Sequence, residues 1–541
     1  MLDDHVTMTC ELAVPVKYDV ANFTQWAQYL IQQQSWAESN QPIESLVSLI
    51  SDKNTRLFIT GFLCLLRQVF QLGRMPVFDP IKLAGVQVID TTKNTHRLQI
   101  EIPAVHHIQG NAYRHAVNAT IDLSQWIANN APTRANRDKA WRVMVDEVIA
   151  PLLMVVPGGK STIPVLKGAH ELGIPIFHLG LGAYQLGWGS KSRRMSSSIT
   201  ESDSQIGSKL TQNKAITANV LRAAGLPAPD HAVANTQQEA LVAAAEIGYP
   251  VVVKPADMDR GEGVTVDVMD TETLTKALIA AQQRTKSKQV IVERQVTGVC
   301  HRLFVAFGEL LYAVKRMPMG VFGDGQRTVA ELVQVQCVAD SLRPPWSRSG
   351  IQPIDDLAIE AFRQLSLTPD SIPVDGQFVP LRRIESTQWG GVDEDVTKIV
   401  HPDNLRAALQ ATELFGLQVA GVDMITSDIS EPWHVNRAII NEVNFAPLFG
   451  GAEISRSYIP AFFARFIDAD GKIPIELFET EQQAFKFQRQ QSIEGKRCYL
   501  TWVDKTIDSE GVAIVMPFAQ LTERVRALVL RTDVDAIAVV S

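Results

Sequence analysis

Apolar and polar positions repeat with two different periods in the first 150 residues. Residues 55–73, TRLFITGFLCLLRQVFQLG, have the apolar spacing of a helix, whereas residues 85–92, GVQVIDTT, and 96–103, HRLQIEIP, alternate as strands do. The N-terminal region is therefore predicted to mix helices and strands. It contains no cluster of residues suited to catalysis.

Two helices are predicted next, before a region rich in strands. The first lies within residues 211–225, TQNKAITANVLRAAG, and ends at its final glycine. The second lies within residues 235–248, where Thr236 and Glu239 have the spacing of a capping box and Gly248 ends the helix.

Short apolar runs from residue 249 onward predict strands. These runs are YPVVVKPA, VTVDVM, KQVIVERQV, the hairpin-like HRLFVAFGELLYAVKR, FVPLRRIES, LQVAGVDMIT and AIINEVNF. A long loop is expected at residues 342–356, and a helix capped by Asp403 at residues 401–416. In the C-terminal piece, VRALVLRT and AIAVVS are predicted strands. This order of elements indicates an α/β (α+β) fold.

Residues 153–166, LMVVPGGKSTIPVL, contain Gly-Lys-Ser after a strand-like run. A phosphate-binding P-loop needs G-x-x-x-x-G-K-[ST], because its glycines let backbone N–H groups surround the phosphates. Here Met154 stands where the first glycine should be, and Pro157 lacks an amide hydrogen. We therefore interpret the segment as a structural turn between a strand and a helix.

Composition narrows the class of protein. The chain of 541 residues has a net charge of −8 and a pI near 5.8, which gives no electrostatic footprint for nucleic acid or an anionic membrane. No apolar run reaches the ~18 residues of a membrane span, and the N-terminus does not resemble a signal peptide. The five cysteines are widely spaced, so we expect free thiols and a cytoplasmic location.

The segment VVVKPADMDRGEGVTV is the first candidate for phosphate chemistry. Lys254 ends an apolar strand, and Gly261 and Gly263 lie in the loop that follows. A glycine-rich turn can direct backbone N–H groups at phosphate oxygens, with a lysine supplying the charge. An ordinary β-hairpin with two glycines is an equally acceptable interpretation of this segment alone.

Three oxygen-bearing side chains in the last strands form a second candidate. Asp423 lies in the strand GVDMIT, while Glu442 and Asn444 are two residues apart in IINEVNF and so share a face. Carboxylate and amide oxygens suit Mg²⁺, especially beside a phosphate. The alternative is a solvated sheet face, but Ile440 and Val443 indicate burial, which makes unpaired carboxylates costly.

Together these motifs, in the order Lys214, VVVKPADMDRGEGVTV, VIVERQVTG, HRLFV, GVDM and NEVN, resemble an ATP-grasp ligase. Within that superfamily the chain most resembles the cyanophycin synthetases, over roughly residues 75–475. Residues 477–541 resemble a shortened Mur-ligase-like domain. The resemblance implies an N-terminal α/β domain (1–156), an ATP-grasp domain (157–476) and a small C-terminal α/β remnant (477–541).

The resemblance also implies a reaction and its residues. ATP would phosphorylate a carboxylate to an acyl phosphate, and an amine would then attack it to form an amide. The ligands of ATP would be Lys214, Lys254, Gly261, Gly263, Glu293, Arg294 and Val296, the last three in the hinge at the adenine and ribose. The ligands of Mg²⁺ would be Asp423, Glu442 and Asn444. Arg302, Arg316 and Arg382 would bind the acyl phosphate or substrate carboxylate.

The departures from the family concern the substrate. Glu385 and Trp389 stand in the substrate stretch RRIESTQWGG, Phe449 and Glu453 follow NFAP, and Arg260 replaces a common histidine. No P-loop follows KIPIELF, so a second ATP site is not expected. We therefore expect a ligase with one ATP site that acts on an amino acid or small peptide, does not bind nucleic acid or membrane, and forms a homo-oligomer. The alternatives are a non-catalytic ATP-binding subunit and a cyanophycin-related ligase.

Overall fold

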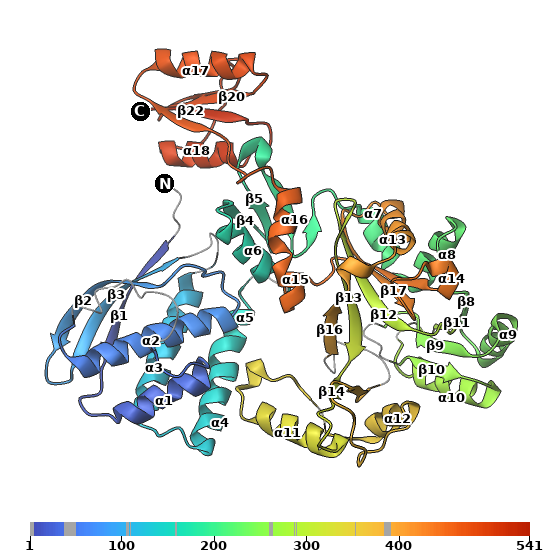
Figure 1. The fold of residues 1–541 in the computed structure, drawn as a ribbon. Helices are drawn as coiled ribbons and strands as arrows, with labels where there is room; N and C mark the ends of the chain where they lie inside the picture. Colours follow the sequence, from blue (N-terminus) through green and yellow to red (C-terminus); the bar gives the residue numbers. More distant parts are fainter. Residues whose placement is uncertain are drawn as a thin grey trace. The chain divides into compact units, whose positions relative to one another are not determined.

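The computed structural model describes residues 5–36, 50–103, 108, 110–156, 159–258, 263–285, 287, 289–351, 353–382 and 391–541 (Figure 1). The chain divides into two compact units. The first consists of Met1–Ser197, Pro344–Trp346 and Phe463–Ser541, and the second of Ser198–Arg343 and Ser347–Phe462. The predicted domain boundaries at residues 156 and 476 remain a prediction.

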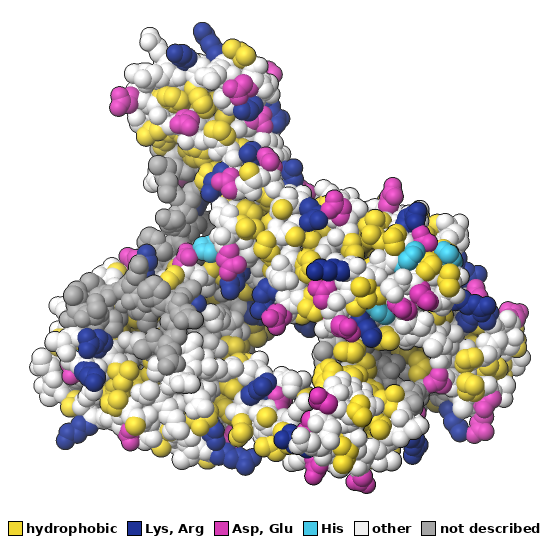
Figure 2. All heavy atoms as spheres, viewed as in Figure 1, with side chains coloured by type: hydrophobic (Ala, Val, Ile, Leu, Met, Phe, Trp, Pro, Cys, Tyr) yellow, Lys and Arg dark blue, Asp and Glu magenta, His cyan; other side chains and the backbone are white. Residues whose placement is uncertain are grey.

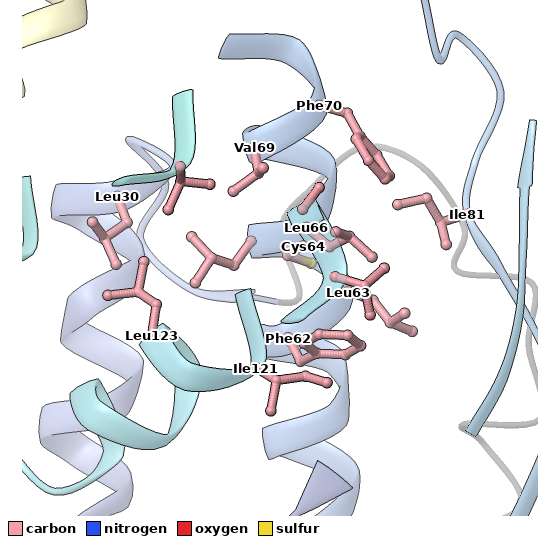
Figure 3. Packing of buried hydrophobic residues seen from close by; sticks show 14 of the residues in the cluster. Leu30, Phe62, Leu63, Cys64, Leu66, Val69, Phe70, Ile81, Ile121 and Leu123 are labelled. Carbon is pink, nitrogen blue, oxygen red and sulfur yellow. The ribbon is translucent and has the colours of Figure 1, made fainter. Parts of the chain in front are cut away.

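The N-terminal part of the first unit packs helices on a three-stranded antiparallel sheet of order β1-β3-β2. Its strands are β1 (His5–Ala13), β2 (Lys82–Asp90) and β3 (Thr95–Pro103), and its helices are α1 (Val20–Leu30), α2 (Lys53–Leu72), α3 (Gly110–Ala128), α4 (Arg134–Arg142), the π-helical segment Val143–Ile149 and α5 (Ala150–Leu153). Figure 3 shows α2 side chains packed among Leu30 of α1 and Ile121 and Leu123 of α3. The predicted helix and the two predicted strands of this region are confirmed.

The strand predicted before Gly-Lys-Ser is wrong. Leu153 ends helix α5, and the next helix, α6 (Thr162–Glu171), begins after a turn that includes Gly159. Met154 is 86% exposed, so the apolar run does not form a buried strand. Because a P-loop follows a strand, this arrangement agrees with a structural turn. Pro157 lies outside the described residues.

Two further groups of strands belong to the first unit. Strands β4 (Ile176–Gly180), β5 (Ala183–Leu186) and β6 (Arg193–Ser196) pair with one another in antiparallel fashion. A separate C-terminal sheet has the order β19-β22-β20-β21. Its elements are β19 (Ile475–Phe478), α17 (Glu481–Ile493), β20 (Cys498–Thr501), β21 (Thr506–Ile507), α18 (Leu521–Val529) and β22 (Ala536–Val540). The strand predicted for VRALVLRT is wrong, because Val525, Leu528 and Val529 have helical spacing and bury one face of α18.

The second unit contains two larger antiparallel sheets. The four-stranded sheet has the order β10-β9-β11-β8 and the five-stranded sheet the order β16-β13-β12-β17-β18. The strands are β8 (His231–Ala234), β9 (Val251–Pro255), β10 (Thr265–Val268), β11 (Val290–Arg294), β12 (Val299–Ala306), β13 (Glu309–Pro318), β16 (Gly391–Asp395), β17 (Val419–Thr426) and β18 (Ile439–Phe445). Every strand predicted from residue 249 to residue 316 is present.

Helices cover one face of each of these sheets (Figure 1). Helices α9 (Gln237–Ile247) and α10 (Thr271–Gln282) pack on the four-stranded sheet, and α13 (Pro402–Leu414) packs on the five-stranded sheet. Thr236 caps α9 as predicted. The predicted cap of α13 is wrong: His401, not Asp403, is its N-cap, and its side chain accepts a hydrogen bond from the Asp403 N–H.

Smaller elements complete the second unit. They are β7 (Ile199–Thr200), α7 (Gln205–Thr211), α8 (Lys214–Ala223), β14 (Gly320–Phe322), α11 (Val329–Ser341), α12 (Asp356–Gln364), β15 (Phe378–Pro380), α14 (Trp433–Asn436) and α15 (Glu453–Ser457), followed by α16 (Ile459–Phe466) at the boundary of the two units. Strands β14 and β15 pair with each other and pack with α11 and α12 around a separate small core.

On the face shown in Figure 2, acidic and basic side chains are interspersed with apolar ones. Among the described helices, none combines the length and the apolar character needed to cross a membrane. The five cysteines have free thiols, as predicted.

Candidate functional site

The four-stranded sheet presents polar groups on the face that lies opposite its helices. Val251 and Val253 of β9 pack in the core with α9 and α10, so Lys254 projects to the other face. Strand β11 follows the same alternation: Val292 is in that core and Glu293 faces away from it. Lys254 and Glu293 therefore share the helix-free face.

The five-stranded sheet also carries charged side chains on the face opposite α13. Val422 and Val443 pack with α13, whereas Asp423 points to the opposite face. In the strand register, Asp423 lies opposite Arg302 of β12 and opposite Glu442 of β18. Cross-strand partners share a face, so these three charged side chains come together on three adjacent strands.

Lys254 joins the two polar faces. Its Nζ lies 2.7 Å from Glu293 Oε1 in the four-stranded sheet and donates to Asn441 Oδ1 in the five-stranded sheet at 3.3 Å. The Lys254 and Glu293 side chains are 9% and 8% exposed. A buried ion pair that uses further hydrogen bonds offsets part of its desolvation cost.

Lys214 makes a second connection of the same kind. It is the first residue of α8, where the Asn213 side chain caps the helix by accepting from the Ile216 N–H. Its ammonium donates to the backbone carbonyl of Met258, just after β9, and lies 3.5 Å from Glu442 Oε1. Both predicted phosphate-binding lysines thus lie where the two polar faces meet.

The Asp423 carboxylate is bound on both oxygens. Arg302 donates from Nε to Oδ1 at 2.7 Å and from Nη2 to Oδ2 at 2.6 Å, and Asn444 Nδ2 donates to Oδ2 at 3.2 Å. Arg316 Nη1 lies 3.9 Å from Oδ2. This arrangement compensates the charge of a carboxylate that is 5% exposed.

The donor set fits a magnesium ion. Asp423, Glu442 and Asn444 supply two carboxylates and one amide on paired strands, and Mg²⁺ prefers oxygen ligands of this kind. Asn444 hydrogen-bonds through its nitrogen, which leaves its amide oxygen as the ligand atom. No group of three His, Cys, Asp or Glu residues suited to a metal occurs among the described residues.

The three predicted arginines do not come together. Arg302 and Arg316 lie at Asp423, but Arg382 forms a bidentate pair with Asp355, with Nη1–Oδ1 and Nη2–Oδ2 distances of 3.0 and 2.9 Å. Asp355 is the N-cap of α12, so this pair belongs to the small core that contains β15. The substrate contact expected for Arg382 came from the resemblance to the family and not from its position in the sequence pattern.

The predicted hinge lies in the link between the two sheets. Glu293 and Arg294 end β11, Val296 follows, and β12 begins at Val299. Glu293 is buried on Lys254, whereas Arg294 is exposed and pairs with Asp230 at 3.3 Å. That these residues contact adenine and ribose remains a prediction.

The glycine loop and the altered substrate stretch are described only in part. Gly263 has a φ of 71° before β10, whereas Gly261, Arg260, Glu385 and Trp389 lie outside the described residues. Phe449 is buried, and its ring centroid lies 4.9 Å from the ring centroid of Phe304. This departure from the family therefore falls in the core.

Two residues of the site were missed in the sequence. Asn441 contacts Lys254, and its role depends on an irregularity in β18 that no sequence period reveals. Gly421 has no side chain where a Cβ would lie 3.3 Å from Arg302 Cδ, so it makes room for the arginine. The glycine within an apolar strand was a signal of such a close approach.

Comparison with known proteins supports an ATP-binding role for this region. Residues 213–302, which include both lysines, match the family model described as "Carbamoyl-phosphate synthase L chain, ATP binding domain". Cyanophycin synthetase of Trichormus variabilis is 30% identical over 397 residues, which are 72% of this chain and 43% of that protein. The bifunctional glutathione biosynthesis protein of Mannheimia succiniciproducens is 33% identical over 46% of this chain and 34% of that protein.

Among solved structures, a bifunctional glutathione synthetase from Pasteurella multocida is 25% identical, with a TM-score of 0.42 over 66% of this chain and 50% of that one. The chain spans less than half the length of the cyanophycin synthetase that it matches. The predicted resemblance to ATP-grasp ligases of the cyanophycin synthetase type is confirmed, as is the mixed α/β fold class.

Proposed function

We propose, from this similarity, that the chain is an ATP-dependent carboxylate–amine ligase that forms an amide bond on an amino acid or small peptide. The observation that carries the proposal is the convergence of two lysines and three oxygen ligands where two sheets meet. Lys214, Lys254 and Arg302 all fall within the matched ATP-binding segment. Their partners Glu442 and Asp423 come from strands outside it.

The proposed reaction has two steps. The γ-phosphoryl group of ATP passes to a substrate carboxylate, which releases ADP and forms an acyl phosphate. An amine then attacks the acyl carbon, the amide forms, and phosphate leaves with the bonding electrons while the amine loses a proton. Both steps concentrate negative charge on phosphoryl oxygens, and fixed cations stabilise such charge.

The chain's own residues have distinct tasks in this scheme. Lys214 and Lys254 bind phosphate oxygens, and Arg316 binds the acyl phosphate or the substrate carboxylate. Asp423, Glu442 and Asn444 would hold Mg²⁺, which when bound neutralises charge on the phosphates. Arg302 keeps the Asp423 carboxylate in a fixed orientation through its two hydrogen bonds.

One ATP site is proposed. The turn after β19 consists of Glu479 and Thr480, with no glycine to wrap a phosphate, before α17 begins at Glu481.

A cyanophycin-related ligase is the second candidate, because relatives named cyanophycin synthetase match 72% of the chain. We further propose that the protein is cytoplasmic, forms a homo-oligomer and takes neither nucleic acid nor membrane as a partner.

The test is a turnover screen. Purified protein is incubated with ATP and Mg²⁺ against pools of amino acids and dipeptides, and ADP, phosphate and new amides are measured, the last by mass spectrometry. We expect ADP release that depends on one acid–amine pair, with one new amide for each ADP. ATP binding without turnover in any pool would instead favour a non-catalytic ATP-binding subunit.

A further inference from the structure

Strand β18 contains an irregularity at the centre of the site. In its pairing with β17, Glu442 lies opposite Asp423 and Ile440 lies opposite Met424, so Asn441 is an extra residue without a partner. Ile440 and Val443 both pack in the core with α13 although they are three residues apart. This is the geometry of a β-bulge, which can redirect a side chain beside an active site.

The bulge brings two consecutive side chains to the site. In a regular strand, Asn441 and Glu442 would point to opposite faces. Here Asn441 contacts Lys254 at 3.3 Å and Glu442 lies 3.5 Å from Lys214. Each of the two lysines therefore has its own acceptor on β18.

The contacts of Lys254 determine how its ammonium is directed. An ammonium has three N–H groups in a tetrahedral arrangement and no acceptor. Glu293 takes one N–H at 2.7 Å from the four-stranded sheet, and Asn441 takes a second at 3.3 Å from the five-stranded sheet. Because two directions are occupied by groups on two rigid sheets, the direction of the third N–H is set.

We propose that Asn441 is a positioning residue that, together with Glu293, directs the third N–H of Lys254 at a phosphate oxygen of the nucleotide. The proposal rests on the proposed function, since it concerns the same ATP site. Glu293 alone would leave the ammonium free to rotate about its own contact. Asn441 removes that freedom, so it contributes to phosphate binding without touching the phosphate.

The test separates phosphate binding from binding of the base. Affinities for Mg–ATP and for adenosine are measured by calorimetry for the wild type, Asn441→Leu and Lys254→Met. We expect Asn441→Leu to weaken ATP binding about tenfold, the worth of one hydrogen bond to a charged group, and to leave adenosine binding unchanged. Asn441→Ala, which adds no bulk, should show the same pattern if the leucine variant does not fold.

Two controls sharpen the result. Asn235→Leu replaces an exposed asparagine that contacts Glu239 before α9, and it should change neither affinity. In the Lys254→Met background, Asn441→Leu should cause no further loss of ATP affinity, because the group that it positions is gone. A further loss of the same tenfold size would overturn the proposal.

The outcomes distinguish the two proposals. The positioning role is wrong if the wild type binds ATP and Asn441→Leu lowers the affinities for ATP and adenosine equally, or lowers neither affinity. The proposed function stands in that case. If the wild type does not bind Mg–ATP, the proposed function fails and the positioning role with it. A selective loss of ATP affinity that needs Lys254 establishes the role.

Discussion

Arg302 and Asp423 lie directly opposite each other on β12 and β17 and form two parallel hydrogen bonds of 2.7 and 2.6 Å. Their side chains are 16% and 5% exposed. Burial of the guanidinium opposes its charge, but the attraction of Asp423 and its hydrogen bonds outweigh that burial and raise the pKa of Arg302. The Arg302 guanidinium therefore keeps its positive charge beside Asp423.

Replacing Arg302 should destabilise the pairing of strands β12 and β17 in the five-stranded sheet. Arg302→Met leaves the Asp423 carboxylate buried with its main partner lost, which costs about 3 kcal/mol in such pairs. We expect hydrogen exchange in peptides from β12 and β17 to accelerate accordingly. The matched control is Arg327→Met, since Arg327 pairs with Asp324 at an exposed site. This substitution should lower the free energy of unfolding by less than about 1 kcal/mol. Equal effects of the two variants would contradict the structural role of the pair.

Glu442→Gln should abolish turnover while the protein stays folded. The substitution keeps the shape of the side chain, but removes a carboxylate from the proposed metal ligands and the charge that faces Lys214 at 3.5 Å. We expect ADP release to fall about 100-fold or more, with an unchanged circular dichroism spectrum. Glu272→Gln, at an exposed helical pair with Lys276, is the control and should keep full activity. Wild-type turnover by Glu442→Gln would refute the metal assignment.

The spacing of apolar and polar residues in a strand predicts which side chains share a face, and that part of the site could be predicted from the sequence. The two-residue spacing in IINEVNF placed Glu442 and Asn444 on one face of the strand, and in the structure both lie on the face that carries Asp423. The partners of these residues could not be predicted, because a partner depends on which strands pair and in which register. The position of Arg302 opposite Asp423, for example, did not follow from the sequence.

Features that break a period were also missed. The extra residue Asn441 is invisible in the sequence, because a bulge depends on the pairing strand. In α18, the run VRALVLRT is short and rich in valine and leucine, as strands are, yet Arg524 just before it is buried and donates to the backbone carbonyls of Val503 and Asp504. That tertiary contact and the helical spacing of the apolar residues outweigh the strand propensity of the valines.

Arg316 and Arg382 should respond differently to replacement by alanine. Arg316 lies 3.9 Å from Asp423 at the site, so Arg316→Ala should lower kcat about 100-fold and leave the folded fraction unchanged. Arg382 is buried in a pair with the N-cap of α12, so Arg382→Ala should accelerate hydrogen exchange in α12. The measurements are steady-state kinetics and exchange in both variants. A lower kcat in Arg382→Ala with unchanged hydrogen exchange in α12 would instead support the predicted contact of Arg382 with the substrate.

The stability of the C-terminal sheet should depend on pH through Asp533. Hydrogen bonds from Arg531, at 3.0 and 2.8 Å, and from the Tyr499 hydroxyl, at 2.9 Å, lower the pKa of Asp533 to about 2 from an ordinary value of 3.8. A carboxyl whose pKa is lower in the folded state stabilises that state above its unfolded pKa. The contribution is lost as the pH falls from about 4 towards 2.

Comparison of the wild type with Asp533→Asn at each pH tests this dependence. At pH 6, amides of β22, which follows Asp533, should exchange faster in the variant. The difference should shrink as the pH falls below 4, because the wild-type carboxyl becomes protonated and loses the same advantage. Glu510→Gln, in the exposed turn after β21, should match the wild type throughout. A difference that stays constant on acidification would show that Asp533 acts through its shape and not through its charge.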